Sequence, residues 1–207
     1  MFDQMVDNTK IYLSEEELKL VSDKEWILTK GKITNGVFAL FGSLSEAMKI
    51  IHDSKKKAFL VEIPASSPKI FKGENYLNLP YVLLDYPRFF GKEDIFAVRT
   101  MFWWGNFFSM TLHVGGIYKL AFQHDILNNI IRQPEDFYIC IHENQWHHYF
   151  EEDNYIPVSS MESDELRSII SRRPFLKVSM KFPLNKWNVM NEELIKAFEK
   201  LLNLPLS

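Results

Sequence analysis

The chain has 207 residues, of which 46% are hydrophobic and 25% charged, and this composition is typical of a folded globular protein rather than a disordered or fibrous one. Its 24 basic and 27 acidic residues give a formal charge of -3, so no overall positive field attracts phosphate backbones and we expect no nucleic-acid partner. A lone cysteine, Cys140, excludes an intramolecular disulfide and favours a cytoplasmic location.

Neither an export signal nor a membrane span is expected. Residues 1–7 are acidic and lack the basic start and the apolar block of an export signal. The most apolar window, 101–112, is interrupted by polar residues and is shorter than the roughly 20 residues that a helix needs to cross a bilayer.

The N-terminal part is predicted to be helical. Ser14 and Glu17 have the spacing of a capping box, which predicts a helix over 15–30 that ends at Gly31. Apolar residues at helical spacing then predict a second helix over 37–51.

Two strands are predicted next, separated by a loop. The apolar run 58–63 ends at a proline and indicates a short strand, whereas 65–78 has the composition of a surface loop. Residues 81–86 are apolar on both faces except for Asp85, a pattern that is typical of a strand in the interior of a sheet.

A helix and a hairpin are predicted in the centre of the chain. Residues 92–103 place apolar side chains at helical spacing and end near Gly105, so we expect a helix there. Two strand-like runs within 109–122 flank Gly115 and Gly116, and a two-residue glycine turn favours a β-hairpin.

The C-terminal third is expected to alternate between helices and strands. The expected elements are a helix at 126–130, strands at 137–141 and 146–150, a helix at 162–172, a strand at 175–182 and a last helix capped by Asn191. The strict alternation of residues 175–182 predicts a strand at the edge of the sheet, with Lys177, Ser179 and Lys181 facing solvent.

This order of elements predicts an α+β fold. Hairpin-like connections favour a mixed, mainly antiparallel sheet of about six or seven strands, with helices packed on it. Because no stretch has the composition of a domain linker, we expect a single domain over residues 1–207.

One group of candidate ligand-binding residues follows the predicted interior strand. It comprises Asp85, Arg88, Arg99, Trp103 and Trp104. These side chains are suited to the floor of a pocket for an anionic or planar ligand, where arginine gives bidentate recognition and the tryptophans form walls. The alternative is that Asp85 and Arg99 form a structural ion pair that locks the predicted helix onto the sheet.

A second group consists of His142, His147 and His148. If Asn144 and Gln145 form a hairpin turn, His142 lies opposite His147, and the two imidazoles can bind a divalent metal such as zinc together with a carboxylate. A turn one residue earlier places Cys140 opposite His147, which indicates a Cys–His nucleophile. The remaining alternative is a polar hairpin with exposed histidines.

These observations favour a non-catalytic binding or interaction protein. Aromatic residues make up 14% of the chain, which suggests aromatic surface for a ligand, a protein partner or a homodimer. No cofactor is expected for this function. The alternative from another class is a small metal-assisted hydrolase that uses the histidines to hold a zinc-type ion, and a further alternative is an enzyme built around Asp85, Arg88 and Arg99.

Overall fold

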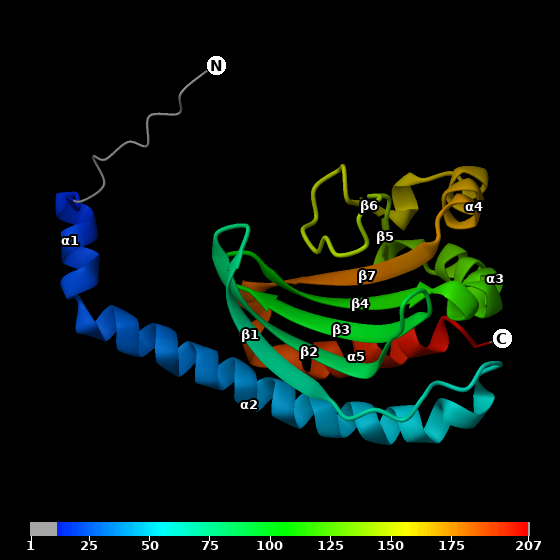
Figure 1. The fold of residues 1–207 in the computed structure, drawn as a ribbon, viewed down its shortest axis with the longest axis horizontal. Helices are drawn as coiled ribbons and strands as arrows, with labels where there is room; N and C mark the ends of the chain where they lie inside the picture. Colours follow the sequence, from blue (N-terminus) through cyan, green and yellow to red (C-terminus); the bar gives the residue numbers. More distant parts are fainter. Residues whose placement is uncertain (1–11, 207) are drawn as a thin grey trace, which may run out of the picture. The chain divides into compact units, whose positions relative to one another are not determined.

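The computed structural model describes residues 12–206 (Figure 1). Residues 1–7, in which no export signal is expected, lie outside the described residues. The packing divides the chain into two compact units, Met1–Val37 and Phe38–Ser207. Within residues 12–206, no helix has both the length and the apolar composition that crossing a bilayer requires.

The first unit contains α1 (Glu15–Ser22) and the first turns of α2 (Lys24–Lys55). The predicted capping box is present, because the Glu17 N–H donates to Ser14 Oγ and the Ser14 N–H donates to the Glu17 carboxylate. The predicted stop at Gly31 is wrong. The break comes at Asp23, because its carboxylate accepts the N–H groups of Glu25 and Trp26 and so caps the start of α2.

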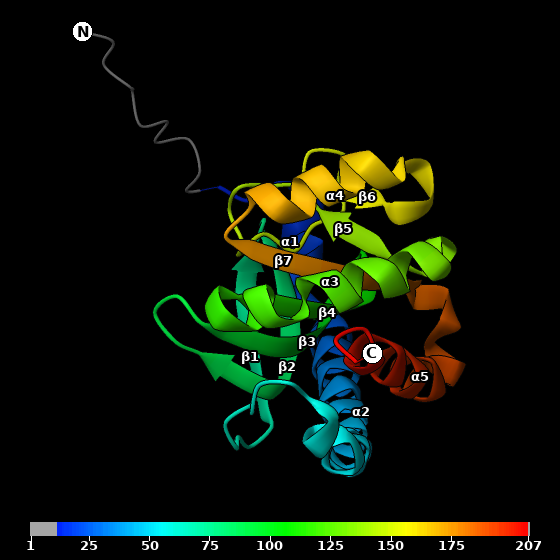
Figure 2. The same ribbon diagram turned by 90° about the vertical axis from the view of Figure 1, so that its right-hand side faces the viewer.

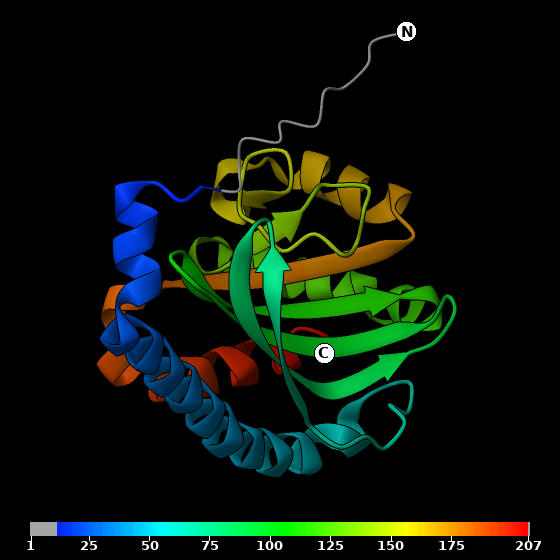
Figure 3. The same ribbon diagram turned by 60° about the vertical axis from the view of Figure 1, so that its left-hand side comes forward.

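The described residues form an antiparallel sheet of seven strands in the order β1-β2-β3-β4-β7-β5-β6, which confirms the predicted α+β fold. The strands are β1 (Lys69–Tyr76), β2 (Leu79–Phe90), β3 (Ile95–Trp103), β4 (Phe107–Gly115), β5 (Tyr138–Cys140), β6 (Tyr155–Pro157) and β7 (Phe175–Pro183). Neighbouring strands twist relative to one another, as Figure 3 shows.

One face of the sheet is apolar and carries helices. Val98, Leu112 and Val178 lie opposite one another on the three central strands and are all buried. Figures 1 and 2 show α3 and α5 against the strands, and α4 beside α3. The helices of this unit after α2 are α3 (Gly116–Arg132), α4 (Ser163–Arg172) and α5 (Met190–Asn203), with short 3₁₀ helices at Lys56–Ala58, Pro134–Asp136, Val158–Ser160 and Leu184–Val189. The core therefore lies between the sheet, these helices and the later turns of α2, whose Phe41 packs on Phe108 of β4.

The opposite face of the sheet carries polar side chains that are nevertheless buried. Thr111 and Ser179 lie opposite each other and share a hydrogen bond of 2.8 Å, and His113 lies opposite Lys177. The segment 141–154, which connects β5 to β6, covers this face, and we call it the β5–β6 loop (Figure 1). Because the loop excludes water, the polar side chains beneath it must find partners within the protein.

The predicted helix over 92–103 is wrong, because β3 occupies most of that range. Ile95, Val98 and Phe102 do have helical spacing. However, almost every residue of β3 is buried. A strand that is buried on both faces has no two-residue alternation by which to distinguish it from a buried helix.

The predicted hairpin at Gly115 and Gly116 is also wrong. β4 ends at Gly115, and α3 begins at Gly116, which has a φ of +55°. A Cβ at Gly116 would collide with Asp94, whose carboxylate accepts the N–H of Ile117 at 2.9 Å. The two glycines therefore form a strand-to-helix turn in which a close backbone approach requires the second one.

Three strand predictions also need correction. The range 58–63 contains no strand, while β1 lies within the predicted loop 65–78. The range 146–150 belongs to the irregular β5–β6 loop, so the predicted hairpin of histidines does not form. Finally, β7 is an interior strand between β4 and β5 rather than an edge strand.

Candidate functional site

Asp85 and Arg99 form a buried ion pair on the polar face of the sheet. The two residues lie directly opposite each other on β2 and β3. Arg99 Nε donates to Asp85 Oδ1 at 2.7 Å and Nη2 donates to Oδ2 at 2.8 Å, so the pair is bidentate. The ion pair predicted from the sequence is therefore present, but it joins two strands rather than a helix and the sheet.

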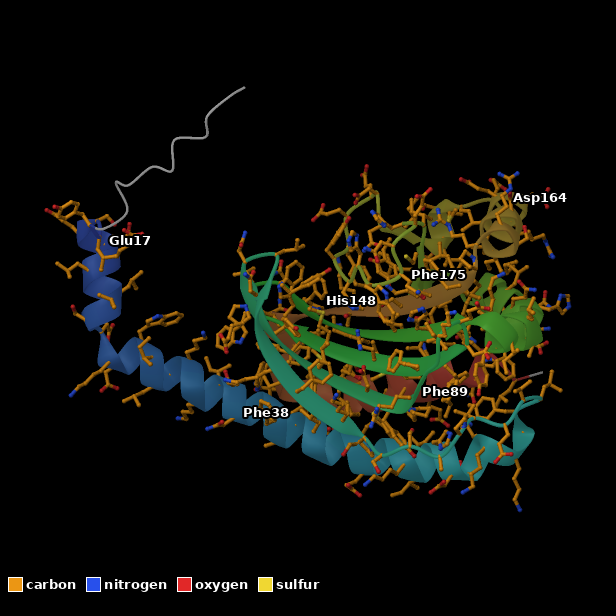
Figure 4. All side chains as sticks on the ribbon, in the orientation of Figure 1. Glu17, Phe38, Phe89, His148, Asp164 and Phe175 are labelled. Carbon is orange, nitrogen blue, oxygen red and sulfur yellow. The ribbon has the colours of Figure 1, made fainter. Side chains whose placement is uncertain are left out.

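His148 completes the polar environment of Arg99. Its Nε2 lies 3.1 Å from Arg99 Nη1, and Figure 4 marks His148 between the β5–β6 loop and the strands. An arginine only donates, so His148 accepts through Nε2 and carries its proton on Nδ1. Burial and the positive charges of Lys177 and Arg99 hold the pKa of His148 well below its usual value, which keeps the ring neutral.

A cavity of about 290 Å³ opens over Arg99, and we call it the Arg99 cavity. Its lining residues come from β1, β2, β3 and the β5–β6 loop, and they are Phe71, Tyr76, Tyr81, Leu83, Arg99, Met101, Trp146 and His148. Aromatic rings thus make up most of the wall, while a guanidinium and a neutral imidazole supply the polar groups. This combination is typical of a small-molecule binding site.

No protein-family model, curated protein or solved structure matches the chain. A functional proposal must therefore come from the chemistry of the chain's own residues.

Lys177 is a buried cation with no counter-charge. Its side chain is 1% exposed, and its ammonium donates to the backbone oxygen of His147 at 2.5 Å and lies 5.2 Å from the centre of the Tyr155 ring. No carboxylate in residues 12–206 forms an ion pair with it. Burial, opposed by Cys140 and reinforced by the charge of Arg99, lowers the pKa of Lys177 to about 8.

Two further hydrogen bonds fasten the β5–β6 loop over this layer. His113 Nε2 lies 2.9 Å from the Gln145 side-chain oxygen, which identifies this nitrogen as the protonated one. Burial and then the charge of Lys177 lower the pKa of His113 to about 3, so the ring is neutral. The Tyr76 hydroxyl accepts the backbone N–H of His148 at 2.7 Å. Together with the bond from Arg99 to His148, these contacts hold the outer wall of the Arg99 cavity in place.

The other ligand-binding candidates are only partly brought together. Trp103 packs beside the cavity, and its Nε1–H donates to the backbone oxygen of Tyr76 at 3.2 Å. Trp104 packs on Phe102, on the apolar side of β3. Arg88 donates from Nε to the backbone oxygen of Ser67. Arg88 and Trp104 do not line the Arg99 cavity.

The metal-binding candidates separate into two groups. The rings of His142 and His147 have centroids 4.3 Å apart within the β5–β6 loop, whereas His148 turns inward to Arg99. Cys140 does not approach His147 as a nucleophile, because its Sγ contacts the His142 backbone oxygen and the Asn154 side chain. In residues 12–206 no cluster of three or more His, Cys, Asp or Glu side chains has the arrangement of a metal site.

The sequence did not single out Tyr76, His113 or Lys177 as site residues. His113 and Lys177 occupy positions on β4 and β7 at which a polar residue looks solvent-exposed. The composition of residues 141–154 could have indicated such a site. This loop is polar and rich in histidine and aromatic residues, so it can form hydrogen bonds to buried polar groups, which an apolar helix cannot do.

A larger cavity, of about 840 Å³, lies between the end of α2 and the segment that leads to β1. It contains Lys49 and Lys56, but each forms an ion pair with an acid three residues earlier in the chain, Glu46 and Asp53 respectively. These two lysines are therefore already neutralised, whereas the polar groups of the Arg99 cavity are fixed by hydrogen bonds to one another.

Proposed function

We propose that the chain is a non-catalytic binding protein that holds a small planar anion, such as an aromatic carboxylate, in the Arg99 cavity. The observation that carries this proposal is the state of Arg99, a guanidinium that lines an aromatic cavity and is held rigidly by Asp85 and His148. Three of its five N–H groups are used in these bonds, and two remain to donate to a ligand.

The charge balance of the buried layer favours an anionic ligand. Asp85 neutralises Arg99, and His113 and His148 are neutral. The pKa of about 8 keeps most Lys177 side chains protonated at pH 7, so one positive charge is left without a counter-charge among residues 12–206. Lys177 binds the backbone of His147, next to the cavity wall, where an anion would lower the electrostatic energy of the buried layer.

The size and walls of the cavity favour a single planar ring. Its volume of about 290 Å³ lies at the lower end of the range found for small-molecule sites. Trp146 forms part of the wall, and its side chain is 47% exposed, so a ligand can reach it from solvent. An aromatic ligand would gain ring contacts with Trp146 and with the tyrosines of β1 and β2.

Benzoate binding tests the proposal. Trp146→Ala should weaken benzoate binding about tenfold, because it removes one aromatic wall without touching the ion pair. Isothermal titration calorimetry measures the affinity. Trp187→Ala is the matched control, since this tryptophan is 38% exposed but packs on Phe102 and Phe108, away from the cavity.

Two analogues of benzoate test whether the charge and the planar ring of the ligand are both required. Benzamide lacks the charge and cyclohexanecarboxylate lacks the planar ring, so both should bind more weakly than benzoate. If benzoate does not bind the wild-type protein, or if the two tryptophan variants lose affinity equally, the proposal is wrong.

The metal-assisted hydrolase remains the second candidate because the imidazoles of His142 and His147 are adjacent. With two protein ligands from this pair, zinc would take its other ligands from water or substrate. If this function is correct, about one equivalent of zinc should bind and His147→Ala should abolish it, as measured by elemental analysis after dialysis. The binding-protein proposal instead predicts that His147→Ala leaves benzoate affinity unchanged.

A further inference from the structure

The ammonium group of Lys181 lies over three aromatic rings at one end of the polar face. The distances from Lys181 Nζ to the ring centroids are 5.7 Å for Phe107, 5.7 Å for Tyr138 and 5.3 Å for Phe150. All three lie within the range of a cation–π interaction, which extends to about 6 Å. We call these three rings the aromatic cage.

The rings are arranged as walls around the ammonium rather than as a flat stack. The plane of the Phe150 ring makes an angle of 78° with that of Phe107 and 84° with that of Tyr138. The rings come from β4, β5 and the β5–β6 loop, and Lys181 reaches them from β7. Three ring faces that surround one cation are the arrangement by which proteins recognise methylated ammonium ions.

Lys181 is held only by these rings. It forms no ion pair or hydrogen bond with the described residues 12–206, and it is exposed even though its neighbours on β7 are buried. The Lys181 side chain can leave the aromatic cage at a modest cost in free energy, because its ammonium regains full hydration in water.

A ligand also has a route to the cage. A cavity of about 320 Å³ lies beside it, and both Tyr138 and Lys181 line this cavity. Its acidic lining residues include Glu135, which forms no ion pair among the described residues. Lysines outnumber acids in this lining, so the cavity provides an open route to the cage rather than a negative charge.

We propose that the aromatic cage is a binding site for a small quaternary ammonium ion of the choline type, and that Lys181 occupies it in the absence of that ligand. A quaternary ammonium is less strongly hydrated than a lysine ammonium, so it loses less on leaving water, and its methyl groups can contact the ring faces directly. This site is separate from the Arg99 cavity, and its function does not depend on a planar anion binding there.

Emptying the cage tests the proposal. Lys181→Ala should bind choline about tenfold more tightly than the wild-type protein, because no internal cation competes. Proton NMR provides the readout, since the N-methyl signal of choline moves upfield when the methyl groups lie over ring faces. Lys186→Ala is the matched control, because it removes the same charge from the same cavity while leaving Lys181 in the cage.

Two further measurements test whether choline binding depends on the aromatic rings and on the positive charge of the ligand. Adding Tyr138→Leu to Lys181→Ala should reverse the gain, and circular dichroism shows whether this double variant folds. In Lys181→Ala, the neutral analogue 3,3-dimethylbutan-1-ol should bind much more weakly than choline. Equal binding of the neutral analogue, an equal gain in Lys186→Ala, or no gain in Lys181→Ala would overturn the proposal. Tighter binding of a trimethyllysine peptide than of choline would overturn the assignment to a small ion.

Discussion

Replacing Lys177 with methionine should raise the free energy of unfolding at pH 7 by about 2 kcal/mol. Burial lowers the pKa of this lysine from 10.5 to about 8, which corresponds to a cost of about 3 kcal/mol for keeping the ammonium buried. Methionine has a similar shape and no charge. It gives up the hydrogen bond to the backbone oxygen of His147, which offsets about 1 kcal/mol of the gain.

The pH dependence of stability provides the sharper check. Above pH 10.5 Lys177 is neutral in both states, and between pH 10.5 and 8 the unfolded chain takes up the proton first. The contribution of Lys177 to the free energy of unfolding should therefore decrease as the pH falls from 10.5 to about 8, and it should stay constant at lower pH. Chemical denaturation at pH 7.5 and pH 10 should show this change in the wild-type protein and a smaller one in Lys177→Met.

An exposed lysine serves as the control. Lys186→Met should change the free energy of unfolding by less than about 0.5 kcal/mol at either pH, because Lys186 is exposed. If Lys177→Met instead destabilises the protein at pH 7 by several kcal/mol, the ammonium makes a net favourable contribution and our account of the layer is wrong.

The same substitution links stability to function. If Lys177 supplies the uncompensated charge that attracts an anion, Lys177→Met should weaken benzoate binding while it stabilises the fold. Such opposite effects are expected where a binding site retains a group that destabilises the protein. If Lys177→Met is more stable but its affinity for benzoate is unchanged, the buried charge does not contribute to ligand binding.

The sequence predicted the fold class but not the environment of the polar face. On β7 the alternation of apolar residues with Lys177, Ser179 and Lys181 predicts a solvated edge strand, whereas the strand is interior. The β5–β6 loop buries the first two of these polar residues, and loop packing leaves no periodic signal. Only Lys181 is exposed as predicted.

Only part of the candidate site could be predicted from the sequence. Asp85 interrupts an apolar strand, and a buried carboxylate requires a cation, so the sequence supports a pair with Arg99 as one of two alternatives. The location of Arg99 on a strand did not follow, because a strand buried on both faces looks like a helix. The position of His148 depended on a long-range contact, and the expected homodimer stays a prediction.

Breaking the pair between Asp85 and Arg99 should have the largest effect on stability. Asp85→Asn keeps the shape of the side chain but leaves the partly buried Arg99 and the buried Lys177 without a negative charge beside them. We expect a loss of about 3 to 5 kcal/mol in the free energy of unfolding, as measured with denaturant. Glu46→Gln, which breaks the exposed pair with Lys49, should cost less than about 1 kcal/mol.

A second substitution tests whether the two charges stabilise each other. Asp85→Leu combined with Arg99→Met removes both charges, so it should be more stable than Asp85→Leu alone, where the guanidinium stays buried and unpaired. If the double variant is no more stable than that single variant, the two charges do not stabilise each other in the folded protein. The predicted coupling would then be absent.

The double variant also distinguishes a structural role from a binding role for Arg99. A structural pair can be replaced by apolar side chains of similar volume at little cost to the fold, whereas a ligand site cannot lose its only guanidinium. We therefore expect the double variant to fold and to lose benzoate binding. If it folds and still binds benzoate with wild-type affinity, then the aromatic walls hold the ligand and Arg99 serves only to join β2 to β3.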